Sequence, residues 1–294
     1  MSQVHWVVPV LLYIAVAHIV LRWAVKKIVG LHSRTKRLCL QYCFCAVFAV
    51  SFAVIMGHLH FTLMTLVILG IGFMNGFACY AYWKAIDISL SRAALFTFLD
   101  DLIAMGLSWV ILHEGKFLTP IGGAGVILCL LFAVLSALHA YKKKEILAFF
   151  GYTLFYSILW GVATFFERYS AFHELQVGQF LSSWYVGAFV ASLCILYFYK
   201  DPDASQKKEG VLRVADVLCM FGVALGTVIC LGLAYWAYSL VPQIIVQPVF
   251  LVSEALVPAV VGWVIFKEHK RFDRWEWFYA CMGLLGVGAI SFGF

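Results

Sequence analysis

Apolar runs of about twenty residues, joined by short polar connections, fill most of this 294-residue chain. A helix that crosses a bilayer needs about 20 mainly apolar residues, each adding about 1.5 Å of length. Ten segments meet this requirement: 4–25, 38–57, 62–84, 91–112, 118–140, 146–167, 176–199, 214–240, 243–266 and 275–293. They predict an all-α integral membrane protein with ten transmembrane helices.

The composition excludes several other classes of protein. Hydrophobic residues make up 64% of the chain and charged residues 12%, whereas soluble domains have about half and about a quarter. Disorder requires low hydrophobicity, and a nucleic-acid module requires basic residues gathered on a polar face. The sequence contains neither a CxxC pair nor a catalytic motif such as HExxH. We therefore expect no nucleic-acid partner, no cofactor, no metal and no enzyme activity.

The basic residues are concentrated in every second connection between the predicted helices. Of the 21 Lys and Arg residues, 19 lie in or beside the connections after the first, third, fifth, seventh and ninth segments, which leaves only Lys116 and Arg168 on the other side. The positive-inside rule makes those odd connections cytoplasmic and puts both termini on the non-cytoplasmic side. We expect a multi-pass protein of a plasma membrane of the bacterial inner-membrane type.

An internal repeat appears when the sequence is shifted by 154 residues. The matched pairs include Asp100 with Glu254, Phe96 with Phe250, Trp109 with Trp263, and Glu114 with Glu268. The predicted units are residues 1–140 and 141–294, each with five helices, and an odd number inserts the second copy upside down. Inverted repeats of this kind build secondary transporters. A duplicated scaffold without transport is the alternative.

Two motifs resemble those of a known group of transporters. LWGVATFFERYSA (Leu159 to Ala171) is similar to the helix that opens a repeat in the EamA-type, ten-helix branch of the drug/metabolite transporter superfamily. The paired runs WVILHEG (Trp109 to Gly115) and WVIFKEH (Trp263 to His269) resemble the end of that family's fourth and ninth helices. The resemblance covers nearly the whole chain and implies the same fold and a transport function.

The chain departs from the family's pattern at three points. The family usually has Glu-Pro in the middle of these helices and Gly-Glu at their ends. Here the middle positions hold Asp100-Asp101 and Glu254-Ala255, and the ends hold His-Glu and Lys-Glu. The family's better-known members are expected to have cytosolic termini, whereas the basic loops here indicate the reverse.

Two acidic residues are the first candidates for a functional site. Asp100 lies roughly 12 Å and Glu254 roughly 16 Å into their predicted helices, so both come near the middle of the membrane. An ionisable group at that depth needs a cavity or a partner. We expect both to bind a cationic group of a solute or to couple transport to protons; helix–helix hydrogen bonding is the alternative. Asp101 lies about 100° around the helix from Asp100, so we expect it to pack elsewhere or to line an entrance.

Six further residues complete the predicted substrate site. They share a face with the two acids or carry aromatic rings on neighbouring helices: Phe96, Phe250, Gln247, Trp160, Tyr82 and Trp236. Aromatic walls beside an acid suit stacking and cation–π contact with an amphipathic or cationic solute. Aromatic residues at helix ends are also common interface anchors. The scarcity of Lys and Arg within the segments argues against strongly anionic substrates.

We expect a secondary transporter of a small neutral, zwitterionic or cationic metabolite or drug, which works by alternating access and exchanges protons through Asp100 and Glu254. A flippase for a lipid-linked metabolite or lipid is the main alternative, and a membrane-embedded enzyme or a non-transporting sensor are others. The expected partners are a small-molecule substrate, protons and membrane lipids. Both a monomer and a homodimer remain open.

Overall fold

The computed structural model describes residues 5–21, 34–88, 98–141, 147–199, 214–266 and 274–292. All regular elements in these ranges are helical, and each of the ten predicted segments contains one. They are α1 (Val7–Ile14) with its π-helical continuation η1 (Ala15–Leu21), α3 (Arg34–Ile55), α4 (Leu63–Ile88), α6 (Phe98–Ile111), the short 3₁₀ turn η2 (Glu114–Phe117), α7 (Pro120–Tyr141), α8 (Leu147–Phe172), α9 (Val177–Phe198), α10 (Val214–Leu240), α11 (Gln243–Phe266) and α12 (Arg274–Phe292).

Four of these helices are long and apolar enough to cross a membrane, judged over the described part of the chain. They comprise Thr35–Ile55, Leu63–Ala85, Val177–Phe198 and Val217–Leu240. Shorter apolar stretches lie in α1 with η1, α7, α11 and α12. An all-helical chain with several apolar helices suits a membrane protein. The ten-span topology and the two inverted repeats stay predictions.

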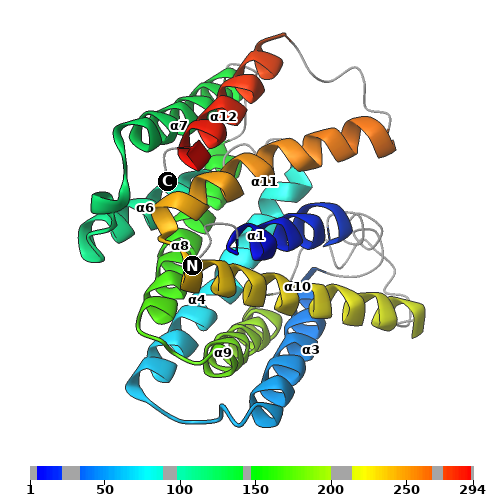
Figure 1. Cartoon of the computed structure of the whole chain (residues 1–294). Coiled ribbons are helices and arrows are strands. Elements are labelled where there is room, and N and C mark those ends of the chain that lie inside the picture. Colours follow the sequence, from blue (N-terminus) through cyan, green and yellow to red (C-terminus); the bar gives the residue numbers. More distant parts are fainter. Residues whose placement is uncertain are drawn as a thin grey trace.

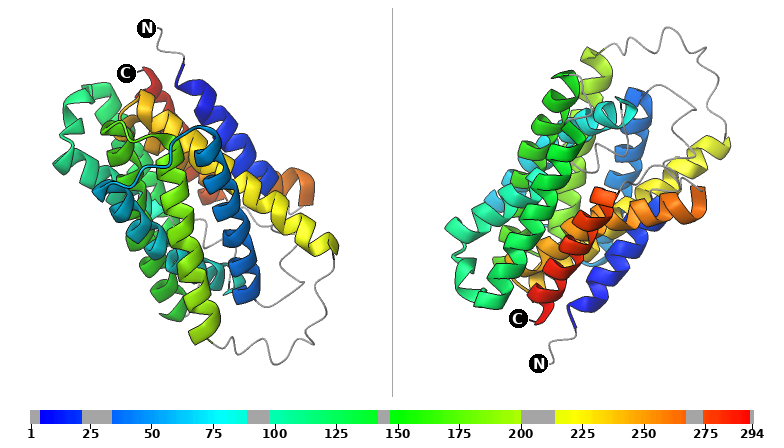
Figure 2. Two further views of the ribbon diagram at one scale, coloured as in Figure 1. Left: turned by 90° about the horizontal axis from the view of Figure 1, so that it is seen from below. Right: turned by 90° about the horizontal axis from the view of Figure 1, so that it is seen from above.

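The helices form one bundle in which sequence-distant elements lie side by side (Figure 1). Helix α9 packs against α3 and α4, α8 packs against α4 and α6, and α7 packs against α12. Helix α1 contacts both α10 and α11 and lies between them (Figure 1). The start of α1 and the end of α12 come to the same end of the bundle (Figure 2).

Small residues bring the backbones of packed helices together. A Cβ added at Gly125 of α7 would lie 2.6 Å from the carbonyl oxygen of Gly286 in α12, and one added at Gly286 would lie 2.8 Å from that of Gly125. A similar approach occurs where Gly72 of α4 meets the backbone of Trp184 in α9. Close helix packing through small residues is typical of helices in lipid, where van der Waals contact drives association.

The interior of the bundle mixes aromatic rings with acidic and amide side chains. Trp184 and Tyr185 of α9 and Tyr238 of α10 are almost completely buried. The polar and charged side chains buried beside this aromatic core include Asp100, Asp101, Glu114, Glu167, Arg168, Gln243 and Gln247. Buried charges are costly unless they are paired, so the partners of these groups define the candidate site.

Candidate functional site

The centre of the candidate site is a hydrogen bond between the two halves of the sequence. The side-chain amide of Gln247 in α11 donates to Oδ1 of Asp101 in α6. Both residues are buried, with 4% and 6% of their surfaces exposed. The second carboxyl oxygen, Oδ2, is also buried and has no hydrogen-bond partner within the described ranges. Asp101 is therefore held through one carboxyl oxygen, while its other carboxyl oxygen is buried without a partner in the described part of the chain.

A chain of polar groups leads to Asp101. Gln243 lies one helical turn before Gln247, and its amide donates to the Gln247 side-chain oxygen at 3.2 Å. The Gln243 amide also donates to the backbone carbonyl of Thr164 in α8 at 3.4 Å, and its oxygen accepts from the Ser108 hydroxyl of α6. The Tyr238 hydroxyl of α10 donates to Gln247 as well. Four helices are thus joined by one directional network that ends on Asp101.

Two more carboxyl groups lie beside Asp101. The Asp100 carboxyl accepts a hydrogen bond from the Asp101 backbone N–H at 2.8 Å, and it forms another with the Tyr156 hydroxyl of α8. Glu254 of α11 is partly buried and close enough to interact electrostatically with both aspartates. Three acids from α6 and α11 therefore share one low-dielectric region, where like charges disfavour each other's ionised forms.

Helix α8 approaches α6 closely at this position. A Cβ added at Gly161 would lie 2.7 Å from the carbonyl oxygen of Asp100 and 2.7 Å from the Cβ of Ile103. Only glycine allows this approach without a shift of one helix. Because α8 supplies Tyr156, the contact at Gly161 sets the distance at which that hydroxyl reaches Asp100.

Aromatic side chains continue from the acids through the bundle. Tyr156 stacks on Tyr82 of α4 at 4.7 Å between ring centroids and on Trp160 at 6.0 Å. Trp160 then meets the edge of Trp184 at 6.1 Å. On the α11 side, Phe250 contacts Tyr13 of α1 at 4.3 Å and Tyr238 at 5.9 Å. The three acids are thus bordered by a series of aromatic rings from six helices.

A buried ion pair lies at the α10–α11 connection. The Arg168 guanidinium of α8 binds Glu114 of η2 at 2.6 Å, and the two side chains are 8% and 1% exposed. Arg168 also donates to the carbonyl of Tyr238 in the last turn of α10, while Glu114 accepts from the N–H of Ile244 in the first turn of α11 at 3.3 Å. A cation at a helix C-terminus and an anion at an N-terminus are both favourable.

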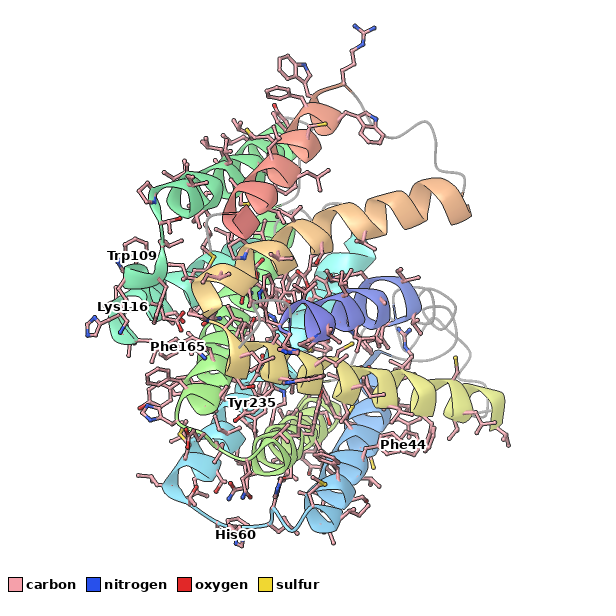
Figure 3. The ribbon with its side chains drawn as sticks, in the orientation of Figure 1. Phe44, His60, Trp109, Lys116, Phe165 and Tyr235 are labelled. Atoms are coloured by element: carbon pink, nitrogen blue, oxygen red, sulfur yellow. The ribbon has the colours of Figure 1, made fainter. Side chains whose placement is uncertain are left out.

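The sequence His113-Glu114-Gly115 explains how the acid reaches this position. His113 has a φ of 54°, so the chain turns sharply after α6. Gly115 lies against Trp109, where a Cβ would come within 2.8 Å of the indole ring. Trp109 and Lys116 lie at the edge of the molecule (Figure 3), whereas Glu114 points inward to Arg168. This pair is structural because each charge already has its partner.

The structure brings most of the predicted site residues together. Asp100, Glu254, Gln247 and Phe250 belong to the acidic region and its network, and Trp160 and Tyr82 join it through Tyr156. Trp236 is 45% exposed and lies outside the cluster, since the inward-facing residues of α10 are Tyr235 and Tyr238. Phe96 lies outside the described residues.

Several residues of the site were not predicted. The sequence led us to expect Asp101 to pack elsewhere than Asp100 or to line an entrance. In the structure it lies on a different face of α6 from Asp100, and α11 covers that face and binds it through Gln247. Gln243 and Tyr238 were missed too. The signal for Gln243 is its four-residue spacing from Gln247, which puts both amides on one helical face.

Within the described residues, no group of three or more His, Cys, Asp or Glu side chains is arranged to hold a metal.

Comparisons with known proteins give information on the fold alone. No protein-family model and no curated protein sequence matches this chain. Solved structures do resemble it: one, a crystal structure described simply as that of a protein, aligns over 97% of this chain and 95% of that chain, with a TM-score of 0.68 and 14% sequence identity. At that identity the likeness shows that the helical arrangement also occurs in an experimentally determined structure.

Proposed function

We propose that this chain is a secondary transporter that moves a small neutral, zwitterionic or cationic solute through the bundle and exchanges protons at its buried acids. The observation that carries the proposal is the Asp101–Gln247 hydrogen bond, which joins α6 to α11 and leaves one buried carboxyl oxygen without a partner among the described residues. Ionisable groups within apolar helices are costly and mark ion or substrate pathways.

The arrangement of the acids supports a role in alternating access. Asp101 comes from the first predicted repeat, and Gln247 and Glu254 come from the second, so each half of the protein contributes to one region. Transporters built from repeats bind their substrates where the halves meet. A change in the protonation of Asp101, or the binding of a solute to it, alters a contact between the two halves of the protein. Coupled transport requires such a change.

The charges of the site favour solutes that are not strongly anionic. The buried Arg168 is neutralised by Glu114 and bound to a carbonyl, so it does not offer a free positive charge. The acidic region instead presents three carboxyl groups beside aromatic rings. Such a surface suits a neutral or cationic group held by stacking and cation–π contact.

The proposal includes two expectations from the sequence. The first is that the chain is an EamA-type drug/metabolite transporter, and the second is that it lies in a plasma membrane with both termini outside the cytoplasm. The proposal is tested with purified protein and a panel of amino acids, quaternary amines, nucleosides and sugars. At least one class should raise the thermal unfolding midpoint, and the same compound should accumulate in proteoliposomes that carry a pH gradient. A panel that neither binds nor crosses would contradict a transport function.

A further inference from the structure

An ammonium group lies among three tyrosine rings near the ends of α4 and α9. Lys84, one turn before the end of α4, has its Nζ 4.7 Å from the centroid of the Tyr199 ring, 5.5 Å from that of Tyr80 and 5.8 Å from that of Tyr152. All three distances are within the roughly 6 Å over which a ring attracts a cation. The Tyr199 hydroxyl also accepts a hydrogen bond from Lys84 at 2.7 Å. We call these three rings the tyrosine cage.

The tyrosine cage is built by the packing of three helices. Tyr80 lies four residues before Lys84, on the same face of α4. Tyr152 comes from the second turn of α8, and Tyr199 directly follows the last residue of α9. The rings of Tyr80 and Tyr199 also meet each other edge to face, with 5.3 Å between their centroids. Since α4 packs against both α8 and α9, the bundle itself holds the rings around one point.

The charge of Lys84 is held without an acidic partner. Within the described ranges, its polar and cation–π contacts are all with the tyrosine cage, whereas the Arg168 guanidinium is bound to the Glu114 carboxylate at 2.6 Å. Lys84 is partly exposed, and Tyr199 is 39% exposed, so the cage is reachable from outside the bundle. A lysine ammonium is strongly hydrated and sits on a flexible stem, so it can leave the rings for water at little cost.

A quaternary ammonium group suits the tyrosine cage better than a lysine does. Aromatic cages are the usual recognition sites of such groups. Methyl groups spread the positive charge and weaken its hydration, so a quaternary ammonium loses less on leaving water than the Lys84 ammonium loses. It also gains contact between its methyl groups and the rings. Exchange of the lysine for such a ligand therefore returns a strongly hydrated charge to water and places a weakly hydrated one between the rings.

The tyrosine cage lies next to the aromatic rings that border the acids. Tyr152 and Tyr156 are four residues apart and share one face of α8, and one turn advances a helix by about 5.4 Å. Tyr156 stacks on Tyr82 at 4.7 Å and forms a hydrogen bond with Asp100. In the predicted topology, the connections that follow α4 and α9 are cytoplasmic. The cage therefore lies between the acids and the cytoplasmic ends of these helices.

We propose that the tyrosine cage is a binding site for the quaternary ammonium group of an organic cation, and that the Lys84 ammonium occupies it until such a solute displaces it. The inference rests on the proposed transport function and names the class of its substrate. Two positive charges repel each other within the cage, so binding of the solute releases Lys84. The solute then lies one turn of α8 away from Tyr156, which binds Asp100.

The first test follows Lys84 in the unaltered protein. The full chain in dodecylmaltoside micelles, which carry no ammonium group, is treated briefly with an acetylating N-hydroxysuccinimide ester, with and without saturating benzyltrimethylammonium. Mass spectrometry of the peptides gives the rate at each lysine. Release from the cage exposes the amine, so the probe should raise acetylation of Lys84 by about threefold or more. Lys116, which lies over the single ring of Phe117 at 5.0 Å, is the internal control and should not change.

The second test measures binding of the same probe to variants by titration calorimetry. Lys84→Ala removes the occupant of the cage and should strengthen binding by about fivefold or more. Lys84→Met removes the same charge but leaves a long side chain among the rings, so its gain should stay below about twofold. Lys116→Ala should bind like the wild type. Addition of Tyr152→Leu to Lys84→Ala should cancel the gain.

Two arms define what the cage recognises. Choline should compete with the probe for the Lys84→Ala protein, whereas its uncharged carbon analogue 3,3-dimethylbutanol should not. A lipid with a choline headgroup carries the same quaternary ammonium as the solute. Acetylation of Lys84 relative to Lys116, measured without the probe, should therefore be equal in nanodiscs of phosphatidylcholine and of phosphatidylethanolamine. Faster acetylation in phosphatidylcholine would assign the cage to a lipid headgroup and refute a solute site.

The outcomes separate this inference from the transport proposal. Unchanged acetylation of Lys84 would refute displacement, and this arm needs no variant to fold. Equal gains in Lys84→Ala and Lys84→Met would reveal a long-range effect of charge and refute the cage. Either result leaves transport standing if a solute still accumulates in proteoliposomes. Displacement of Lys84 and stronger binding in Lys84→Ala, without uptake of any cation, would support the cage and refute transport.

Discussion

Gln247 donates a hydrogen bond to Asp101 although the two residues are 146 positions apart in the chain. The bond crosses from α11 to α6, and Gln247 is held in place by Gln243 and by the Tyr238 hydroxyl. A buried amide with all of these partners has one defined orientation. Asp101 is therefore held through one oxygen in a fixed position, while its other oxygen is buried without a partner among the described residues.

Replacement of Asp101 by Asn should stabilise the fold while abolishing proton exchange. The Asn carbonyl can still accept from Gln247, and the buried charge is lost, so the free energy of unfolding should rise by about 1–3 kcal/mol. Thermal unfolding measures this, with the exposed Glu174→Gln as control. A loss of stability in Asp101→Asn would contradict the assignment.

The Glu114–Arg168 pair should be important for stability. Glu114→Gln leaves the Arg168 charge buried without its partner, which should lower the free energy of unfolding by about 3–5 kcal/mol. Lys116→Gln, in the same turn but exposed, should change it by less than about 0.5 kcal/mol. Denaturation of the two variants in the same detergent compares them. Similar midpoints would show that the ion pair does not hold α10 and α11 together.

Gly161 should tolerate no side chain. Gly161→Ala would put a methyl group 2.7 Å from the Asp100 carbonyl oxygen and should destabilise the bundle by about 1–3 kcal/mol. Gly151→Ala on the same helix has no atom within 4 Å of the new Cβ and should be neutral or stabilising by up to about 1 kcal/mol. Equal effects at the two positions, measured by thermal unfolding, would show that α6 and α8 are not tightly packed beside Asp100.

Two tryptophans of the predicted site should behave differently. Trp160 lies between Tyr156 and Trp184 in the aromatic series, so Trp160→Leu should weaken binding of a cationic solute about three- to tenfold. Trp236 is largely exposed, and Trp236→Leu should leave binding unchanged. Titration of both variants with benzyltrimethylammonium checks this. Loss of binding in Trp236→Leu would place the site on the other face of α10.

The helices and part of the site were predictable because apolar length and a mid-helix acid are local features. Asp100, Gln247 and Glu254 each stand out as polar residues within apolar runs. The role of Asp101 was not predictable, because a helical wheel separates it from Asp100 but does not show that α8 covers one face and α11 the other. The orientation of α10 was hidden for a related reason: a helix that is apolar all round gives little sign of which face turns inward.

Glu114, Glu167 and Arg168 show a second limit of the sequence. Glu114 and Arg168 are 54 residues apart, and only packing reveals that they neutralise each other. Glu167 stood within a motif that indicated a family, but nothing in the motif distinguishes a solvated acid from an unpaired buried one. That distinction depends on tertiary packing, which buries Glu167 and leaves its Oε1 without a hydrogen-bond partner among the described residues.

The central claim is that the buried acids couple solute movement to protons, and the most direct measurement is proton flux in proteoliposomes loaded with a pH-sensitive dye. Addition of benzyltrimethylammonium should change the internal pH when the wild-type protein is present. The double variant Asp101→Asn/Glu254→Gln should show no change above that of empty liposomes. An equal pH change in the wild type and the double variant would contradict the account.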